Sequence, residues 1–147
     1  MSLQAQIRED MKTAMKTGDK DRLKVVRLIM AAVKQVEVDQ RIEVDDAGVL
    51  TVLDKMVKQR RDSVEQFEKG GRDDLVRIEL DEITVLEGYL PERLSDIELD
   101  ALINEAISST GAESIRDMGK VMGQIKSKAA GRADMGSVGA KVKALLG

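Results

Sequence analysis

The near absence of aromatic side chains constrains this chain most, because it limits what can fill a core. Phe67 and Tyr89 are the two aromatic residues among 147, and there is no Trp. Met, Leu, Ile, Val and Ala must therefore build the interior; most of them favour helices, and Met fills irregular gaps. Charged residues make up 35% of the chain, a share that suits helices with solvated outer faces.

Apolar residues recur at intervals of three and four throughout the chain, which predicts an all-α fold. The spacing and the capping residues place helices over about 3–17, 20–36, 46–69, 73–90, 95–110, 114–130 and 137–147. The second helix is apolar around most of its circumference, so we expect it at the centre. In the fourth helix Val76, Leu80, Ile83, Leu86 and Leu90 form the expected buried stripe. Residues 37–46 read as a charged connection, and we reject a strand there because no partner strand exists.

The expected domain boundary lies at Pro91. Proline ends a helix, and Ser95–Glu98 reads S-x-x-E, the capping box that opens another. We therefore predict a four-helix N-terminal unit over residues 1–91 and a small three-helix C-terminal unit over residues 92–147.

The chain contains no Cys and no His. Thiol nucleophiles, disulfides, imidazole bases and most zinc or haem sites are thereby excluded. We expect no metal, no cofactor and no catalytic residue. The acidic side chains of the fourth helix, including Glu79 and Glu82, read as a solvated face. No apolar leader or membrane span is visible, so the sequence predicts a cytoplasmic protein.

Charge is unevenly distributed along the chain. Residues 1–91 carry −3, residues 92–113 carry −5, and residues 114–147 carry +5 from seven cations and two carboxylates. The seven cations are the candidate nucleic-acid-binding residues: Arg116, Lys120, Lys126, Lys128, Arg132, Lys141 and Lys143. The alternative is that they are solvated helix ends, where cations complement the helix dipole. Without stacking aromatics, any RNA contact should involve phosphates and the shape of a folded RNA.

Gly119 and Gly123 lie four residues apart inside the sixth predicted helix. Each costs about 1 kcal/mol relative to Ala, so close approach of another group should compensate. That group is either the last helix or an RNA backbone, and close helix packing is our first expectation. The turn over residues 131–136 is either an anion-binding loop before a helix N-terminus or a tight connection capped by Asp134 or Ser137. The connection over residues 69–75 needs no function beyond capping.

Several short motifs resemble the YqeY family. They are Lys69-Gly-Gly-Arg72, Tyr89-Leu-Pro91, Asp117-Met-Gly-Lys-Val-Met-Gly123 and Gly131-Arg-Ala-Asp134. The resemblance covers essentially the whole chain and implies a helical protein with a larger N-terminal and a smaller C-terminal subdomain. The latter is similar to the tail domain of the B subunit of glutamine-dependent Asp/Glu-tRNA amidotransferase (GatB), which grips tRNA. The segment after Gly123 departs from the family pattern, where a more apolar, proline-containing stretch is expected.

The resemblance implies carbon-nitrogen ligase activity with glutamine as amido-N-donor. The chain itself offers no phosphate loop, metal site, Cys nucleophile or Ser/Lys constellation for such a reaction. Our leading hypothesis is therefore an accessory module that contacts tRNA, or a tRNA-handling protein complex, through residues 92–147. The alternatives are an amide-transfer subunit and a non-catalytic protein–protein adaptor that uses the N-terminal unit.

Overall fold

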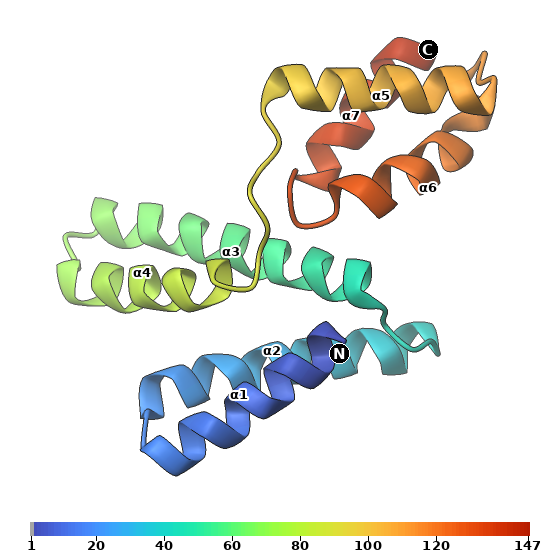
Figure 1. The fold of residues 1–147 in the computed structure, drawn as a ribbon. Coiled ribbons are helices and arrows are strands. Elements are labelled where there is room, and N and C mark those ends of the chain that lie inside the picture. Colours follow the sequence, from blue (N-terminus) through green and yellow to red (C-terminus); the bar gives the residue numbers. More distant parts are fainter. Residues whose placement is uncertain (1) are drawn as a thin grey trace. The chain divides into compact units, whose positions relative to one another are not determined.

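A computed structural model describes residues 2–147, which form seven α-helices and one 3-10 turn (Figure 1). The helices are α1 (Leu3–Thr17), α2 (Lys20–Gln40), α3 (Asp46–Lys69), α4 (Asp73–Glu87), α5 (Asp96–Thr110), α6 (Met118–Ala129) and α7 (Met135–Leu146), with the turn η1 (Ile115–Asp117) before α6. No strand occurs within residues 2–147, so the all-α prediction is confirmed. The chain divides into unit 1, Met1–Leu90, and unit 2, Pro91–Gly147.

Short polar side chains begin several of the helices. Asp19 and Asp45 accept hydrogen bonds from backbone N–H groups in the first turns of α2 and α3. Ser95 and Glu98 form the predicted capping box at the start of α5, each side chain accepting from the other residue's N–H. These interactions satisfy donors that a helix end otherwise leaves unpaired.

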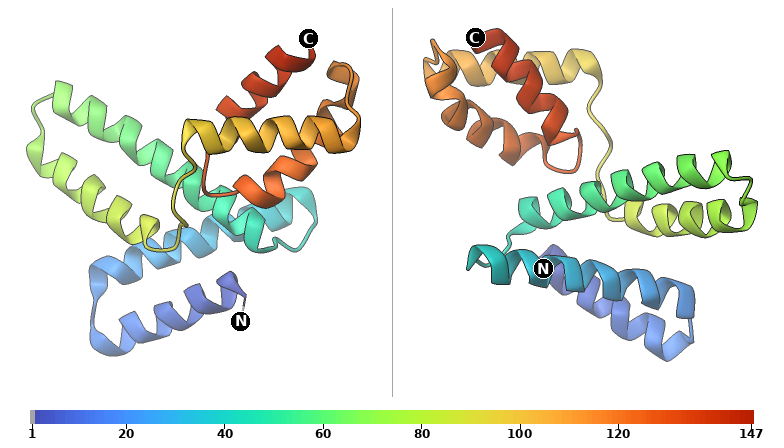
Figure 2. Two further views of the ribbon diagram at one scale, coloured as in Figure 1. Left: turned by 45° about the horizontal axis from the view of Figure 1, so that its top comes forward. Right: turned by 180° about the vertical axis from the view of Figure 1, so that it is seen from behind.

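Unit 1 consists of two helical hairpins, α1–α2 and α3–α4 (Figures 1 and 2). Helix α2 contacts α1, α3 and α4, and its Val26 and Ile29 are fully buried, which agrees with its expected central position. It continues to Gln40, so the connection to α3 is shorter than predicted. Leu80, expected on the buried stripe of α4, is exposed instead.

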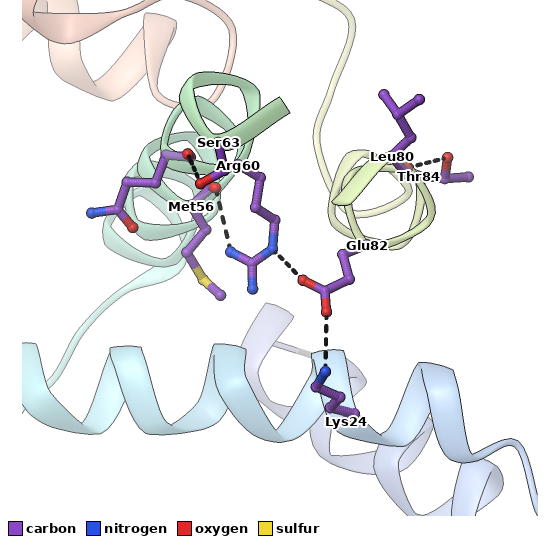
Figure 3. Close-up of polar contacts among 8 residues, drawn as sticks. Lys24, Met56, Arg60, Ser63, Leu80, Glu82 and Thr84 are labelled. Atoms are coloured by element: carbon purple, nitrogen blue, oxygen red, sulfur yellow. Dashed lines mark hydrogen bonds and ion pairs between the residues drawn. The ribbon is translucent and has the colours of Figure 1, made fainter. Parts of the chain in front are cut away.

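An ion-pair cluster joins three helices of unit 1 (Figure 3). The Glu82 carboxylate of α4 lies 2.8 Å from Arg60 Nε of α3 and 3.5 Å from Lys24 Nζ of α2. Arg60 also donates to the Met56 carbonyl oxygen. The prediction of a solvated Glu82 is wrong, because α2 and α3 cover this side of α4.

The end of unit 1 is fixed by its one tyrosine. The Tyr89 hydroxyl donates to the Asp10 carboxylate of α1 and accepts from Arg22 of α2 at 3.3 Å. Burial, followed by the Asp10 hydrogen bond, raises the pKa of Tyr89 to about 12. The residues just before Pro91 are thus tied to the first hairpin.

Unit 2 packs α5, α6 and α7 around its own core. Ile103 of α5, Val121 and Ile125 of α6, and Val138 and Val142 of α7 are all almost completely buried. The start of α6 differs from the prediction, since Ser114 begins the short turn η1 and not the α-helix itself. Ile115 is exposed in this turn, whereas Val121 of α6 is fully buried.

Candidate nucleic-acid interface

Helix α6 has a buried face and an outer face with different chemistry. Val121, Ile125 and Ala129 are spaced by four and face the core of unit 2. At 100° per residue, Gly119, Gly123 and Ser127 point to the opposite side. The cations that belong to the outer face are Lys120 and Lys126, which flank the two glycines, and both are exposed. The outer face of α6, as defined by these five residues, is smooth and basic.

The two glycines do not make room for another helix. A Cβ atom added at Gly119 or at Gly123 would meet no heavy atom within 4 Å. The prediction of close helix packing at these positions is therefore wrong. The glycine at the α6–α7 contact is Gly139 of α7, whose added Cβ would lie 3.7 Å from Met118 and 3.9 Å from Met122. The sequence correctly placed Gly119 and Gly123 four residues apart within one helix. It could not show which side of α6 the two glycines occupy.

Two of the seven cations lie beside acidic side chains of α5. Lys141 Nζ is 3.3 Å from Asp100, and Lys128 Nζ is 3.8 Å from Glu105. All four side chains are exposed, so each pair contributes little to stability. Their positive charge is nevertheless partly neutralised, and they lie apart from the outer face of α6.

Arg132 has a structural position in the loop between α6 and α7. Its Nε donates to the Glu92 carbonyl oxygen at 2.8 Å, and its own carbonyl oxygen accepts from Leu94 N–H at 2.9 Å. These two bonds fasten the start of unit 2 to the 131–134 loop. At the start of α7 the Asp134 carboxylate accepts from Gly136 N–H at 3.1 Å. A carboxylate thus occupies the helix N-terminus, which favours a tight capped connection over an anion-binding loop.

The remaining cations, Arg116 and Lys143, are exposed in η1 and in the last turn of α7. Next to Arg116, Asp117 accepts from the N–H groups of Glu113 and Ser114. These hydrogen bonds, with a smaller contribution from Lys120, lower the pKa of the Asp117 carboxyl. Asp117 is therefore ionised and reduces the positive potential at the start of α6, so the basic character of the outer face increases towards Lys126.

The outer face of α6 presents lysine side chains, which are the groups that contact phosphates in nucleic-acid-binding proteins. Residues 2–147 contain no group of three or more acidic side chains placed to hold a metal ion. Ser127 completes the outer face and was missed in the sequence analysis, although its spacing of four from Gly123 was the available signal. Within the described part of the chain, no helix is long and apolar enough to cross a membrane.

Fold and surface together define a two-unit helical protein whose C-terminal unit exposes a basic helix face. The sequence matches the family described as "Yqey-like protein" over residues 4–146, and the chain belongs to this family. The suspected resemblance is thereby confirmed, as a family assignment.

Curated relatives include fungal proteins called "Altered inheritance of mitochondria protein 41, mitochondrial". The protein of Pyrenophora tritici-repentis is 30% identical over 144 residues, which are 96% of this chain and 79% of the relative. Those of Lachancea thermotolerans and Eremothecium gossypii are 32% and 33% identical and align with 71% and 74% of this chain. The chain spans 57% and 63% of these two relatives' lengths, so their whole-protein roles do not transfer directly.

The names of these relatives contradict the expectation of a cytoplasmic protein, because they are named as mitochondrial. That expectation rested on the absence of an apolar leader. Mitochondrial targeting segments are amphipathic and rich in Arg and Ser, so an apolar run is the wrong signal to look for.

Proposed function

We propose that this protein is a tRNA-contacting accessory module whose unit 2 binds the RNA backbone. The observation that carries the proposal is the outer face of α6, where Lys120 and Lys126 flank two glycines with nothing packed on them. Phosphate contacts by Lys and Arg supply most of the sequence-independent affinity of nucleic-acid-binding proteins. The similarity of this part of the chain to the amidotransferase tail supports tRNA as the RNA.

Gly119 and Gly123 support the proposal because each of them lowers the stability of α6. Each destabilises a helix by about 1 kcal/mol relative to Ala, and no intramolecular packing offsets this at Gly119 or Gly123. A helix face without Cβ atoms lets another backbone approach closely. We infer that the approaching backbone is the ribose–phosphate chain, drawn in by the adjacent lysines.

The proposed role is binding without catalysis. Two lysines on a helix face provide few phosphate contacts, so the affinity is modest and falls steeply with salt. The contacts position an RNA but read no sequence, so different tRNAs bind similarly. Any amide transfer that the family resemblance implies takes place on a partner that supplies the reacting groups.

Fluorescence anisotropy of labelled, unfractionated tRNA across a salt series tests this proposal. Changing Lys120 and Lys126 to Ala should lower the magnitude of the log–log salt slope by roughly 2, about 1 for each lost phosphate contact. The matched control changes Lys128 and Lys141 to Ala. These lysines lie beside Glu105 and Asp100, and the double substitution removes the same number of charges. Equal losses in both variants, or no salt-dependent binding by the parent at low ionic strength, would refute the proposal.

A protein–protein adaptor is the second candidate function, and one observation favours it. Ile97 in the first turn of α5 is 83% exposed, the largest value among the exposed large apolar side chains of the described residues. A large apolar side chain so exposed offers an anchor for a protein partner. Co-purification of the same proteins from cells with and without RNase treatment, and its loss in Ile97→Ser, would support the adaptor over the RNA-binding role.

A further inference from the structure

Unit 1 carries a net negative charge, yet one of its helices presents a basic outer surface. No carboxylate occurs between Arg22 and Val36 of α2. Three exposed cations occupy the side of the helix that faces away from the core: Lys20, Arg27 and Lys34. Together with Ala31 they define the α2 outer face.

The geometry of α2 aligns these cations. Lys20, Arg27 and Lys34 are spaced by seven residues, so they lie nearly in line along the helix, roughly 10 Å apart. The buried side, with Val26, Ile29 and Val33, lies opposite. The row of cations therefore extends over roughly 21 Å of open surface.

Part of the charge of this row is balanced within unit 1, because Asp21 follows Lys20 and Lys34 contributes to lowering the pKa of the Glu37 carboxyl. Lys24 lies 3.5 Å from Glu82, but no ion pair joins Lys20, Arg27 or Lys34 to a carboxylate among residues 2–147. A shallow depression beside Lys20 and Arg27 is lined by Lys20, Leu23, Lys24, Arg27, Leu28 and Ala31. Ala31 contributes only a methyl group to this lining, so a ligand can approach the helix closely beside it.

The composition of the α2 outer face favours a phosphate backbone over a protein or a membrane. Protein interfaces are depleted in Lys and depend on large aromatic, Arg or apolar anchors near their centre. Here Arg27 lies at the centre of the row, both ends are Lys, and the one large apolar side chain beside it, Leu28, is 40% exposed. Helices that bind in a membrane surface carry a broad apolar face with Trp, Phe or Leu, and the apolar side of α2 is already used by the core of unit 1.

We propose that the α2 outer face is a second RNA-contacting surface, which binds phosphates of the same RNA as the outer face of α6. This inference rests on the proposed function, and it assigns unit 1 a part in it. Neither face alone has enough cations for tight binding. Two weak sites joined by a short connection raise each other's effective concentration, so that a modest contact on each unit gives useful avidity.

The test measures binding of labelled, unfractionated tRNA by the full chain and by three variants. The first changes Lys20, Arg27 and Lys34 to Ala. The second is a matched control that removes three exposed cations elsewhere on unit 1, namely Lys12, Lys55 and Lys69. The third changes Lys120 and Lys126 on α6. All substitutions replace exposed helical residues by Ala, the best helix former, so circular dichroism and melting should be unchanged.

The α2 variant should lower the magnitude of the salt slope by roughly 3 and weaken binding at low salt by tenfold or more. The control should stay close to the parent. If the α2 variant and the control behave alike while the α6 variant loses binding, the second surface is refuted and the proposed function stands. If the parent does not bind tRNA, both fail together. If poly-glutamate of matched charge displaces tRNA at equal concentration, the face recognises acidic chains in general and the assignment to RNA is overturned.

Discussion

Arg60 and Glu82 form a close ion pair between α3 and α4, with 2.8 Å between Arg60 Nε and the carboxylate, and each side chain is only 13% exposed. Charged hydrogen bonds of this kind contribute about 1.5–3 kcal/mol, and an unpaired partner left behind adds to the loss. We expect Glu82→Gln to lower the free energy of unfolding of unit 1 by about 2 kcal/mol in urea titrations. Glu65→Gln removes the exposed pair with Lys69 and should cost less than about 1 kcal/mol. Equal effects of the two substitutions would contradict a structural role for Glu82.

The buried side of α4 can be tested by two substitutions three residues apart. Ile83 is 6% exposed and Leu80 is 48% exposed. Burying an unpaired carboxylate costs several kcal/mol, a large part of the stability of a domain. Ile83→Asp should therefore unfold unit 1, whereas Leu80→Asp should leave its thermal melting nearly unchanged. Similar melting of both variants would show that the assigned phase of α4 is wrong.

The contrast between Ile83 and Leu80 also shows how much of the fold a single sequence can predict. The helix starts at Asp45 and Ser95 depend on local chemistry, namely short side chains that accept from the next turn, and could be located without a structure. The position of Leu80 depends on tertiary packing. Helix α4 contacts both α3 and α2, which turns its buried side towards Glu82 and leaves Leu80 outside. A buried stripe predicted on the assumption that α4 packs against a single helix therefore includes Leu80 incorrectly.

The same distinction applies to the candidate site. The basic character of residues 114–147 follows from the sequence alone, because charge can be counted. Whether Gly119 and Gly123 face another helix or solvent depends on where α5 and α7 pack. Likewise, Arg132 reads as one more cation until its hydrogen bond to the Glu92 carbonyl oxygen is seen.

The open surroundings of Gly123 reverse the stability effect expected from the sequence. Close packing would make a larger residue harmful there, but a Cβ at Gly123 meets nothing within 4 Å. We expect Gly123→Ala to stabilise unit 2 by up to about 1 kcal/mol through helix propensity. Gly111→Ala is the opposing control, because the φ of +65° at Gly111 is strained for a residue with a Cβ. Thermal melting followed by circular dichroism distinguishes the two, and a destabilised Gly123→Ala variant would indicate a contact on the outer face of α6.

Tyr89 should make the stability of unit 1 sensitive to alkaline pH. Its pKa is raised to about 12 in the folded chain, against about 10 for an unfolded tyrosine. The folded state thus holds the phenol proton more tightly. The resulting contribution to the free energy of unfolding is complete below about pH 10 and is lost as the pH rises towards 12.

Tyr89 is the one tyrosine and there is no Trp, so phenolate absorbance reports its titration alone. Asp10→Asn should lower the midpoint, and Tyr89→Phe should remove this part of the pH dependence. A midpoint near 10 in the folded parent would contradict the observed environment.

Arg132 and Lys120 should have separable effects on unit 2. Arg132 Nε bonds to the Glu92 carbonyl oxygen at 2.8 Å and the Arg132 carbonyl oxygen accepts from Leu94, so Arg132→Ala should lower the melting temperature of unit 2. The lost hydrogen bond from a charged donor corresponds to about 1.5–3 kcal/mol before solvent screening of this exposed group reduces it, so we expect about 1 kcal/mol. Lys120→Ala breaks no such bond and should leave melting unchanged.

In tRNA binding, Lys120→Ala should have the larger effect and Arg132→Ala the smaller one, the reverse of their effects on melting. Lys120→Ala should lower the magnitude of the salt slope by roughly 1, because it removes one of the phosphate contacts that we propose. Arg132→Ala should leave the slope nearly unchanged at temperatures where unit 2 stays folded, since its guanidinium is engaged with the backbone of its own unit. Anisotropy and melting measured on the same two variants decide the matter. A reduced slope for Arg132→Ala with unaltered melting would place Arg132 on the RNA and not on the loop that it fastens.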